Sequence, residues 1–175
     1  MINDRSERQG KMAFKVAILT ISDRGSKGER EDSSGPLIEE MVKDLPGSVI
    51  HYEIIPDEKD RIASALKKSA DQLRADLILT TGGTGLSPRD VTPDATLQVI
   101  DKEVPGFAEA MRAESLKKTP HAMISRAICG IRGASLIVNL PGSPKSVREN
   151  LSVILPALPH ALSKLKGDPS ECGQP

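Results

Sequence analysis

The residues best suited to chemistry are three glycines and a carboxylate near the middle of the chain. Thr80–Gly85 reads TTGGTG and follows an apolar run, Ala75–Leu79, that is typical of a buried strand. Glycines between a strand and a helix leave backbone N–H groups free and let a ligand approach closely, as phosphate sites require. Asp90 stands in the same loop, and a carboxylate beside a phosphate makes sense if a divalent cation joins the two. The sequence therefore predicts a phosphate site with a metal.

Two further segments contain residues that could hold an anion. Ser143 and Pro144 suit the N-cap and first position of a helix, which places Lys145 in a first turn where the helix dipole disfavours a cation. A bound phosphate would reverse that preference; the alternative is a solvated surface lysine. Ser125 and Arg126 together could hold an anion, or could cap and pair locally.

The helix that follows the glycine loop has a clear start signal. Thr92, Pro93 and Asp94 read as the N-cap and the first two helical residues, with the Asp94 carboxylate stabilised by the helix dipole. This interpretation makes Thr92 and Asp94 structural, although their place beside the glycine loop also makes them candidates for substrate binding.

The elements that must position these residues alternate along the chain. Apolar and β-branched runs predict strands at 14–21, 49–55, 77–81 and 134–140, with an extended segment at 129–132. Apolar residues at helical spacing predict helices at 36–45, 58–73, 93–101, 105–117, 122–128 and after 144, the last one broken or kinked by Pro156 and Pro159. This alternation is typical of an α/β fold with a mostly parallel sheet covered on both faces.

Four loops should then meet at one edge of the sheet, because each follows a predicted strand: 22–25, 56–58, 82–90 and 141–145. Three of them carry a carboxylate, namely Asp23, Asp57 and Asp90. Asp57 could instead cap the helix that follows it, and Asp23 could stabilise its own turn.

Composition excludes several other classes. The 24 basic and 24 acidic residues balance, which argues against a nucleic-acid binder that neutralises phosphates. The two cysteines, Cys129 and Cys172, are far apart in the sequence and predict neither a disulfide framework nor a metal site. No apolar run is long enough to span a membrane, and the N-terminus does not have the pattern of a signal peptide. We therefore expect a cytoplasmic protein without membrane or nucleic-acid partners. No Walker A or dinucleotide fingerprint is present, and no histidine pairs with a nucleophile. We expect tails at 1–13 and 168–175 around one domain at 14–167, with Met1 or Met12 as the start.

Several of these segments together resemble one known family, the Mog/MoaB proteins of molybdenum-cofactor biosynthesis. The resemblance runs from Phe14 to Gly167, and the pairing of TTGGTG with RDVTPDAT is its most specific part. The matching segments are Ile21–Arg24, Ile55–Glu58, Thr80–Gly85, Arg89–Thr96, Pro105–Phe107 and Leu140–Lys145.

The resemblance implies a fold and an activity. The fold is a three-layer α/β/α sandwich with a mostly parallel mixed sheet, in which 129–132 and 134–140 form a hairpin. The activity is that of a molybdopterin adenylyltransferase, which transfers AMP from ATP to the terminal phosphate of molybdopterin with Mg²⁺ and releases pyrophosphate. The family implies a homotrimer or hexamer and a molybdate-insertion (MoeA-like) partner enzyme.

The resemblance also implies roles for individual residues. Asp57 and Asp90 become the catalytic carboxylates and the metal ligands, while Ser22, Asp23 and Ser125 become pterin-site residues with Gly82–Gly85 as the floor. Backbone N–H groups of the glycine loop, with Lys145 or Arg126, would hold phosphates. The full set of expected substrate-binding residues is Ser22, Asp23, Gly82, Gly83, Thr84, Gly85, Thr92, Asp94, Ser125, Arg126, Pro141, Gly142, Ser143 and Lys145.

Two other functions remain open at this point. A non-catalytic module of the MoaB branch could bind molybdopterin or organise a complex, and a related domain in competence-damage-inducible proteins suggests a metal-dependent nucleotide hydrolase. The presence of both Asp57 and Asp90 favours catalysis.

Overall fold

One mixed sheet of six strands organises the chain in a computed structural model that describes residues 13–169. The strand order is β2-β1-β3-β6-β5-β4. The four strands on one side, β1, β2, β3 and β6, run parallel, and β5 and β4 follow antiparallel at the other edge. The bounds are β1 Phe14–Ile21, β2 Gly47–Ile55, β3 Leu77–Thr81, β4 Lys102–Glu103, β5 Cys129–Arg132 and β6 Ser135–Leu140.

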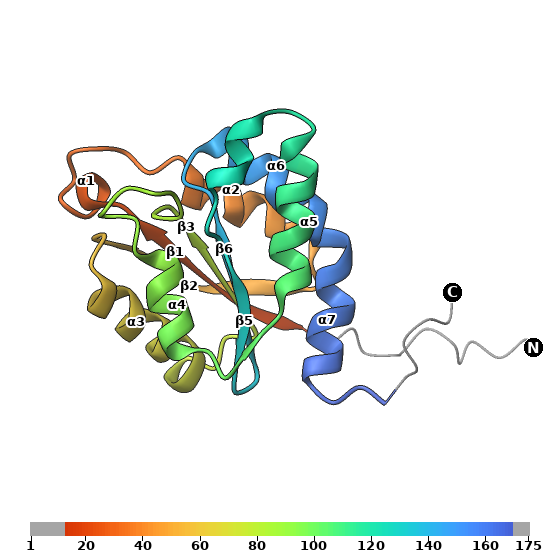
Figure 1. The fold of residues 1–175 in the computed structure, drawn as a ribbon. Coiled ribbons are helices and arrows are strands. Elements are labelled where there is room, and N and C mark those ends of the chain that lie inside the picture. The colour runs from red at the N-terminus through yellow and green to blue at the C-terminus, as the bar shows by residue number, and fades with distance from the viewer. Residues whose placement is uncertain (1–12, 170–175) are drawn as a thin grey trace, which may run out of the picture.

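Helices cover both faces of the sheet, so the expected α/β/α sandwich is confirmed (Figure 1). One face carries α3 (Lys59–Lys67), which continues as a π-helical turn at Lys68–Gln72, and α4 (Thr92–Val99). The other face carries α2 (Ser34–Met41), α5 (Pro105–Leu116), α6 (Pro144–Ile154) and α7 (Leu158–Leu165). Short helical segments complete the list: α1 at Asp23–Ser26 and 3₁₀ turns at Val42–Asp44, Pro120–Ile124 and Leu155–Ala157.

Alternation along the strands sends side chains to two separate cores. In β1, Val16 and Ile18 pack under α2 and the helices beside it, while Ala17 and Leu19 pack under α3 and α4. Successive residues of a strand point to opposite faces, so an almost continuous apolar run is the expected sequence of a strand buried on both sides. This explains why the central strands could be read from composition alone.

The final helical region confirms the effect of its prolines. α6 ends at Ile154, a 3₁₀ turn spans Leu155–Ala157, and α7 begins at Leu158, so the region is broken where Pro156 and Pro159 lack an N–H donor. The implied hairpin of β5 and β6 is also confirmed.

One local prediction was wrong, and one short strand was not predicted. The segment predicted as a helix at 122–128 contains only a 3₁₀ turn that ends at Ile124, and its last residues are irregular because the Arg126 N–H donates to Thr84 O across the chain. The two-residue strand β4 was not foreseen, since so short an edge strand leaves no periodic signal.

The predicted tails, 1–13 and 168–175, lie outside the described residues except for 13, 168 and 169, and so does Cys172. Cys129 has a free, buried thiol, and desolvation raises its pKa to about 12. No helix among residues 13–169 combines the length and apolar character needed to cross a membrane.

Candidate active site

The four loops predicted to converge do meet at the carboxyl edge of the parallel strands. The Ser22 N–H donates to Ile55 O at 2.8 Å, which joins the first two loops. The Gly82 N–H donates to Leu140 O at 3.2 Å, and the Thr81 hydroxyl donates to Pro141 O at 2.7 Å. These bonds join the end of β1 to the end of β2, and the end of β3 to the end of β6.

The glycine loop adopts a backbone that side chains would prevent. Gly82 and Gly83 have φ angles of +101° and +63°, a region that residues with a Cβ rarely adopt. A Cβ on Gly82 would lie 2.3 Å from Ile21 O, and one on Gly83 would lie 2.5 Å from the Thr92 hydroxyl. The loop is thus pressed against its neighbours, and glycine is required for both conformation and space.

Thr92 holds this loop, and its predicted role as N-cap was wrong by one position. The N-cap of α4 is Val91, and Thr92 is the first helical residue. The buried Thr92 hydroxyl donates to Gly82 O at 2.9 Å, and its N–H donates to Gly83 O at 3.1 Å. Its side chain bonds backward to the loop and not forward to the helix, so Thr92 fixes the shape of the loop.

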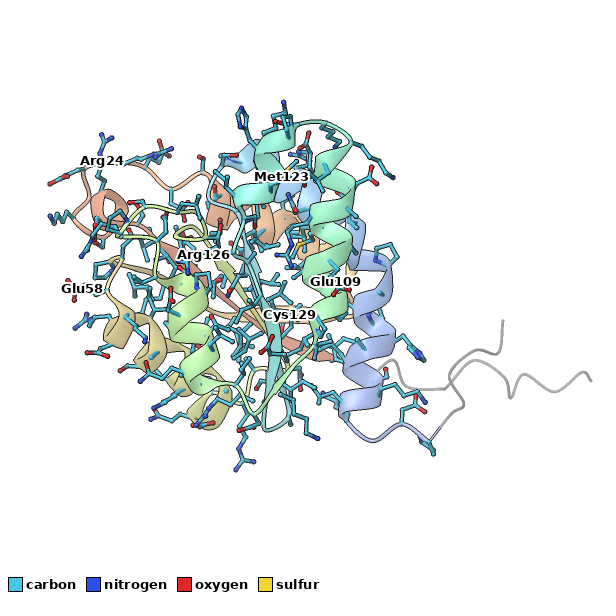
Figure 2. The ribbon with its side chains drawn as sticks, viewed as in Figure 1. Arg24, Glu58, Glu109, Met123, Arg126 and Cys129 are labelled. Atoms are coloured by element: carbon cyan, nitrogen blue, oxygen red, sulfur yellow. The ribbon has the colours of Figure 1, made fainter. Side chains whose placement is uncertain are left out.

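Arg126 and Asp94 support the loop from its other end. The Arg126 guanidinium donates to Gly85 O at 2.9 Å, to Asp90 O, and to the Asp94 carboxylate at 3.0 Å. The hydrogen bond from Arg126 lowers the pKa of Asp94. Arg126 lies beside the start of α4 (Figure 2), and its guanidinium binds protein atoms that are 32 to 41 residues away in the sequence, so its pairing is not local.

Asp57 does not cap the helix that follows it, so that alternative was wrong. The N-cap residue of α3 is Glu58, which makes no side-chain cap bond. Asp57 Oδ2 instead accepts from the Asp23 N–H at 2.8 Å, and its Oδ1 would lie 3.1 Å from a Cβ on Gly83. Desolvation raises the pKa of Asp57, and the charges of Asp23 and Asp90 add to the effect.

Asp23 bonds to two other segments and not only to its own turn. Its Oδ1 accepts from the Asp57 N–H at 3.0 Å, and its carboxylate accepts both Arg89 Nε at 3.0 Å and Arg89 Nη2 at 2.7 Å. The Arg89 hydrogen bond lowers the pKa of Asp23. Asp23 therefore connects the loop after β1 with the loops that carry Asp57 and Arg89.

Asp90 lies against the far end of the glycine loop. Its Oδ2 accepts from the Ser87 N–H at 2.8 Å and would lie 2.9 Å from a Cβ on Gly85. Asp57 contacts the loop at Gly83 and Asp90 contacts it at Gly85. The two carboxylates thus flank a short stretch of glycine-loop backbone.

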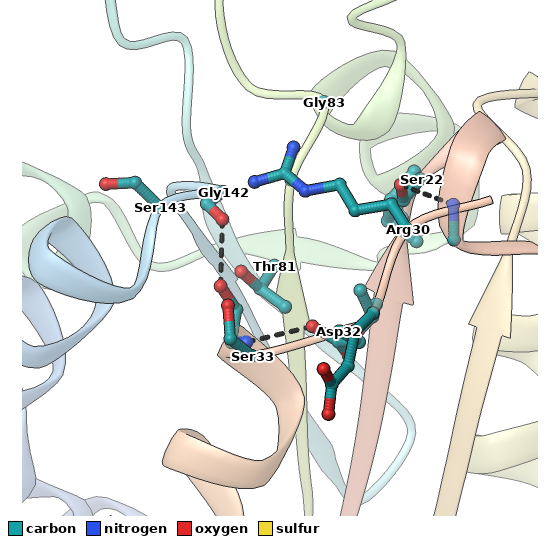
Figure 3. A pocket seen from close by; sticks show the side chains of 14 residues that line it. Ser22, Arg30, Asp32, Ser33, Thr81, Gly83, Gly142 and Ser143 are labelled. Atoms are coloured by element: carbon teal, nitrogen blue, oxygen red, sulfur yellow. Dashed lines mark hydrogen bonds between the residues drawn. The ribbon is translucent and has the colours of Figure 1, made fainter. Parts of the chain in front are cut away.

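A first cavity, of about 300 Å³, opens beside Gly82 and Gly83. It is lined by five predicted residues, Ser22, Gly82, Gly83, Gly142 and Ser143. Residues that were not predicted also line it: Arg30, Glu31, Asp32 and Ser33 from the loop before α2, and Ser34 at the start of α2. Figure 3 shows the Arg30 side chain extending across this cavity toward Gly142. Sequence reasoning missed Arg30 because it lies in a polar loop with no pattern around it.

Asp32 anchors that loop. Its carboxylate accepts from the Thr20 hydroxyl and the Tyr52 hydroxyl, each at 2.5 Å, and from the N–H groups of Ser34 and Gly35 at the start of α2. Desolvation alone would raise the pKa of Asp32, but these hydrogen bonds outweigh it and lower the pKa. The sequence signal that could have found it is an aspartate two residues ahead of a helix start.

A second cavity, of about 270 Å³, opens on the other side of the loop, beside Thr84 and Gly85. Ser125 and Pro141 line it, as do apolar residues of α5 and the 3₁₀ turn, among them Met111 and Ile124. Arg112 also lines it, and one of its terminal nitrogens donates to Ala127 O at 2.7 Å. Ser22 and Ser125, which the family resemblance implies are both pterin-site residues, thus line different cavities on the two sides of the loop.

Ser143 and Lys145 differ in outcome. Ser143 is the N-cap of α6, with its hydroxyl accepting from the Ser146 N–H at 3.2 Å, as predicted. Lys145 is exposed and lines neither cavity.

The chain has recognisable relatives. Residues 17–160 match a family model described as "Probable molybdopterin binding domain". The chain belongs to this family. A molybdopterin adenylyltransferase of Helicobacter pylori (strain J99) is 48% identical over 155 residues, covering 87% of this chain and 88% of the relative.

Solved structures agree with this assignment. The molybdopterin biosynthesis enzyme MoaB of Thermus thermophilus superposes with a TM-score of 0.84 at 52% identity, covering 90% of this chain and 99% of that one. The tungsten cofactor synthesizing protein MoaB of Pyrococcus furiosus superposes with a TM-score of 0.81 at 39% identity, covering 89% and 98%. The family expected from the sequence motifs is thereby confirmed.

The carboxylates at this site suit a magnesium ion only if substrate oxygens complete the coordination of that ion. Among residues 13–169 no group of three or more histidine, cysteine, aspartate or glutamate side chains is placed to hold a metal. Mg²⁺ is usually bound by one or two carboxylates with substrate phosphates and water, and not by an all-protein cage. Asp57 and Asp90 beside the glycine-loop backbone fit that requirement.

Proposed function

We propose that this protein is a molybdopterin adenylyltransferase, which transfers AMP from ATP to the terminal phosphate of molybdopterin. The observation that carries the proposal is the position of Asp57 and Asp90 against a glycine loop that contributes to two cavities. Two cavities that share one phosphate-binding loop suit a reaction between two phosphorylated substrates. Close relatives named for this activity support the same conclusion.

The chemistry of the cavity walls favours one arrangement of the substrates. The second cavity has apolar walls and a serine hydroxyl at Ser125, which suits a flat heterocycle such as the pterin. The first cavity lies at the N-termini of α2 and α6 and contains Arg30, which suits the phosphates of ATP. The reacting phosphates would then meet over Gly83–Gly85.

The reaction needs no protein nucleophile. An oxygen of the pterin phosphate attacks the α-phosphorus of ATP, the bond from that phosphorus to the β-phosphate oxygen breaks, and pyrophosphate leaves with the bonding electrons. Loop N–H groups and Arg30 would stabilise the charge that develops on the phosphate oxygens. Asp57 and Asp90 would hold Mg²⁺, which supplies positive charge between the phosphates when bound.

Transfer of label from ATP labelled at the α-phosphate tests this function. We expect label to appear on molybdopterin in the wild type, in step with pyrophosphate, and to be lost in Asp57→Ala and Asp90→Ala. Asp71→Ala, which removes a carboxylate of an exposed ion pair with Arg132, is the matched control and should transfer normally. Tight pterin binding without labelled product would indicate a binding or scaffolding module, and pyrophosphate formation without pterin would indicate a hydrolase.

The finer family properties extend this proposal. We infer a homotrimer or hexamer that delivers its product to a molybdate-insertion (MoeA-like) enzyme. Light scattering and co-purification test the two statements separately. A cytoplasmic location stays a prediction from the sequence.

A further inference from the structure

Three segments far apart in the chain are joined by one set of hydrogen bonds around Asp57. The Asp23 N–H donates to Asp57 Oδ2 at 2.8 Å, and the Asp57 N–H donates to Asp23 Oδ1 at 3.0 Å, so each residue binds the carboxylate of the other. Arg89 then binds Asp23 through both Nε and Nη2, at 3.0 and 2.7 Å. The three residues come from the loops after β1, β2 and β3.

This arrangement limits how Asp57 can orient. One carboxylate oxygen, Oδ2, is engaged by the Asp23 N–H, which leaves Oδ1 directed at Gly83 of the glycine loop. Asp23 is in turn held in place, because its carboxylate accepts two parallel hydrogen bonds from the planar guanidinium of Arg89. Such a two-point contact fixes direction as well as distance, which a single ammonium group does not do.

We propose that Arg89 is a positioning residue, which acts through Asp23 to hold the Asp57 carboxylate in its place beside the glycine loop. The expected effect of Arg89 on AMP transfer rests on the proposed function, whereas its effect on the orientation of Asp57 does not depend on that function. The described hydrogen bonds of the Arg89 side chain go to Asp23, so its hydrogen-bonded connection to Asp57 runs through Asp23, although its positive charge also acts on Asp57 directly.

A contribution to stability alone would look different. The side chains of Arg89 and Asp23 are 56% and 36% exposed, and ion pairs this exposed add little to folding stability. Glu58 and Lys27 also lie near enough to influence the pair electrostatically, yet neither offers the two-point contact. Loss of Arg89 should therefore change orientation far more than stability.

The chain contains a matched control at Arg132. Its guanidinium binds Asp71 with the same two-point geometry, Nε at 3.0 Å and Nη2 at 2.6 Å, but lies at the β5–β6 hairpin, away from the glycine loop. Arg132 also donates to Val99 O, so Arg132→Ala disturbs its surroundings at least as much as Arg89→Ala.

The first test needs no substrate. Amide hydrogen exchange, followed by NMR, should accelerate by about tenfold or more at Asp23 and Asp57 in Arg89→Ala, because Arg89 no longer holds in place the carboxylates that accept from these two amides. The same two amides should be unchanged in Arg132→Ala. Unchanged exchange in Arg89→Ala would overturn the proposal.

The second test measures AMP transfer. Arg89→Ala should lower kcat by about 10- to 100-fold, as loss of an orienting partner does elsewhere, with KM for ATP within about twofold and an unchanged unfolding midpoint. In an Asp23→Asn background the same change should have no further effect. Full recovery of kcat by Arg89→Lys would show that charge suffices and would overturn the positioning role.

The two tests separate this inference from the proposed function. If the wild type transfers AMP and Arg89→Ala transfers it equally well, the positioning role is refuted while the function stands. If the wild type does not transfer AMP, the function is refuted, and amide exchange alone decides whether Arg89 holds Asp57.

Discussion

Replacing Gly83 by alanine should disable the site through the glycine loop alone. Its φ of +63° disfavours any residue with a Cβ, at about 1–2 kcal/mol. The new methyl group would also lie 2.5 Å from the Thr92 hydroxyl and 3.1 Å from Asp57 Oδ1. Thr92 is fully buried and cannot move aside without losing its bond to Gly82 O, which adds about 1–3 kcal/mol for the unpaired groups.

Gly133→Ala isolates the first of these effects. Gly133 has a similar φ of +54°, but nothing lies within 4 Å of its added Cβ. Denaturant unfolding should therefore show a loss of about 1–2 kcal/mol for Gly133→Ala and about 2–5 kcal/mol for Gly83→Ala. AMP transfer should be lost only in Gly83→Ala. Equal stability losses in the two variants, with transfer retained in both, would refute the packing of the loop against Thr92 and Asp57 as the cause.

Three other substitutions test separate parts of the site. Arg30→Ala should raise KM for ATP about tenfold, as loss of a charged hydrogen bond to phosphate would, with kcat little changed; an unchanged KM would remove Arg30 from the phosphate site. Asp57→Asn should abolish transfer yet unfold at a higher temperature than the wild type at pH 7, since burial raises the folded-state pKa of Asp57 and makes its charged form unfavourable. This gain in unfolding temperature should fade as the pH drops through the raised pKa, and should vanish below the ordinary value of 3.8. Asp32→Asn should act in the opposite sense, because the hydrogen bonds from Thr20 and Tyr52 lower the folded-state pKa of Asp32: its stability loss should be complete above pH 3.8 and should disappear as pH falls through the depressed pKa. Thermal unfolding across pH decides both.

The sequence predicted those features that depend on short-range patterns. Apolar runs such as 14–21 and 77–81 are long and bounded by polar loops, so strands and their order of alternation with helices followed from them. Parallel strands bring their following loops to one edge, which is why Asp23, Asp57 and Asp90 could be grouped from their positions in the sequence.

The errors concern side chains whose partners are distant in sequence. Thr92 and Asp57 are of residue types that often cap helices, and each stands just before a predicted helix. Their sequence neighbours give no sign that Thr92 binds Gly82 and Asp57 binds Asp23 instead. The partners of the Arg126 guanidinium, Gly85 O and the Asp94 carboxylate, are equally distant in sequence and could not be foreseen from local patterns. Arg30 was missed for the converse reason, since nothing near it in sequence marks the cavity that the fold places beside it.

Pyrophosphate release from Mg·ATP, with and without molybdopterin, tests the proposed transfer most directly when wild type and Asp90→Ala are measured side by side. We expect release only when the wild-type protein and molybdopterin are both present. Release without the pterin, or undiminished release by Asp90→Ala, would contradict a transferase that depends on this carboxylate.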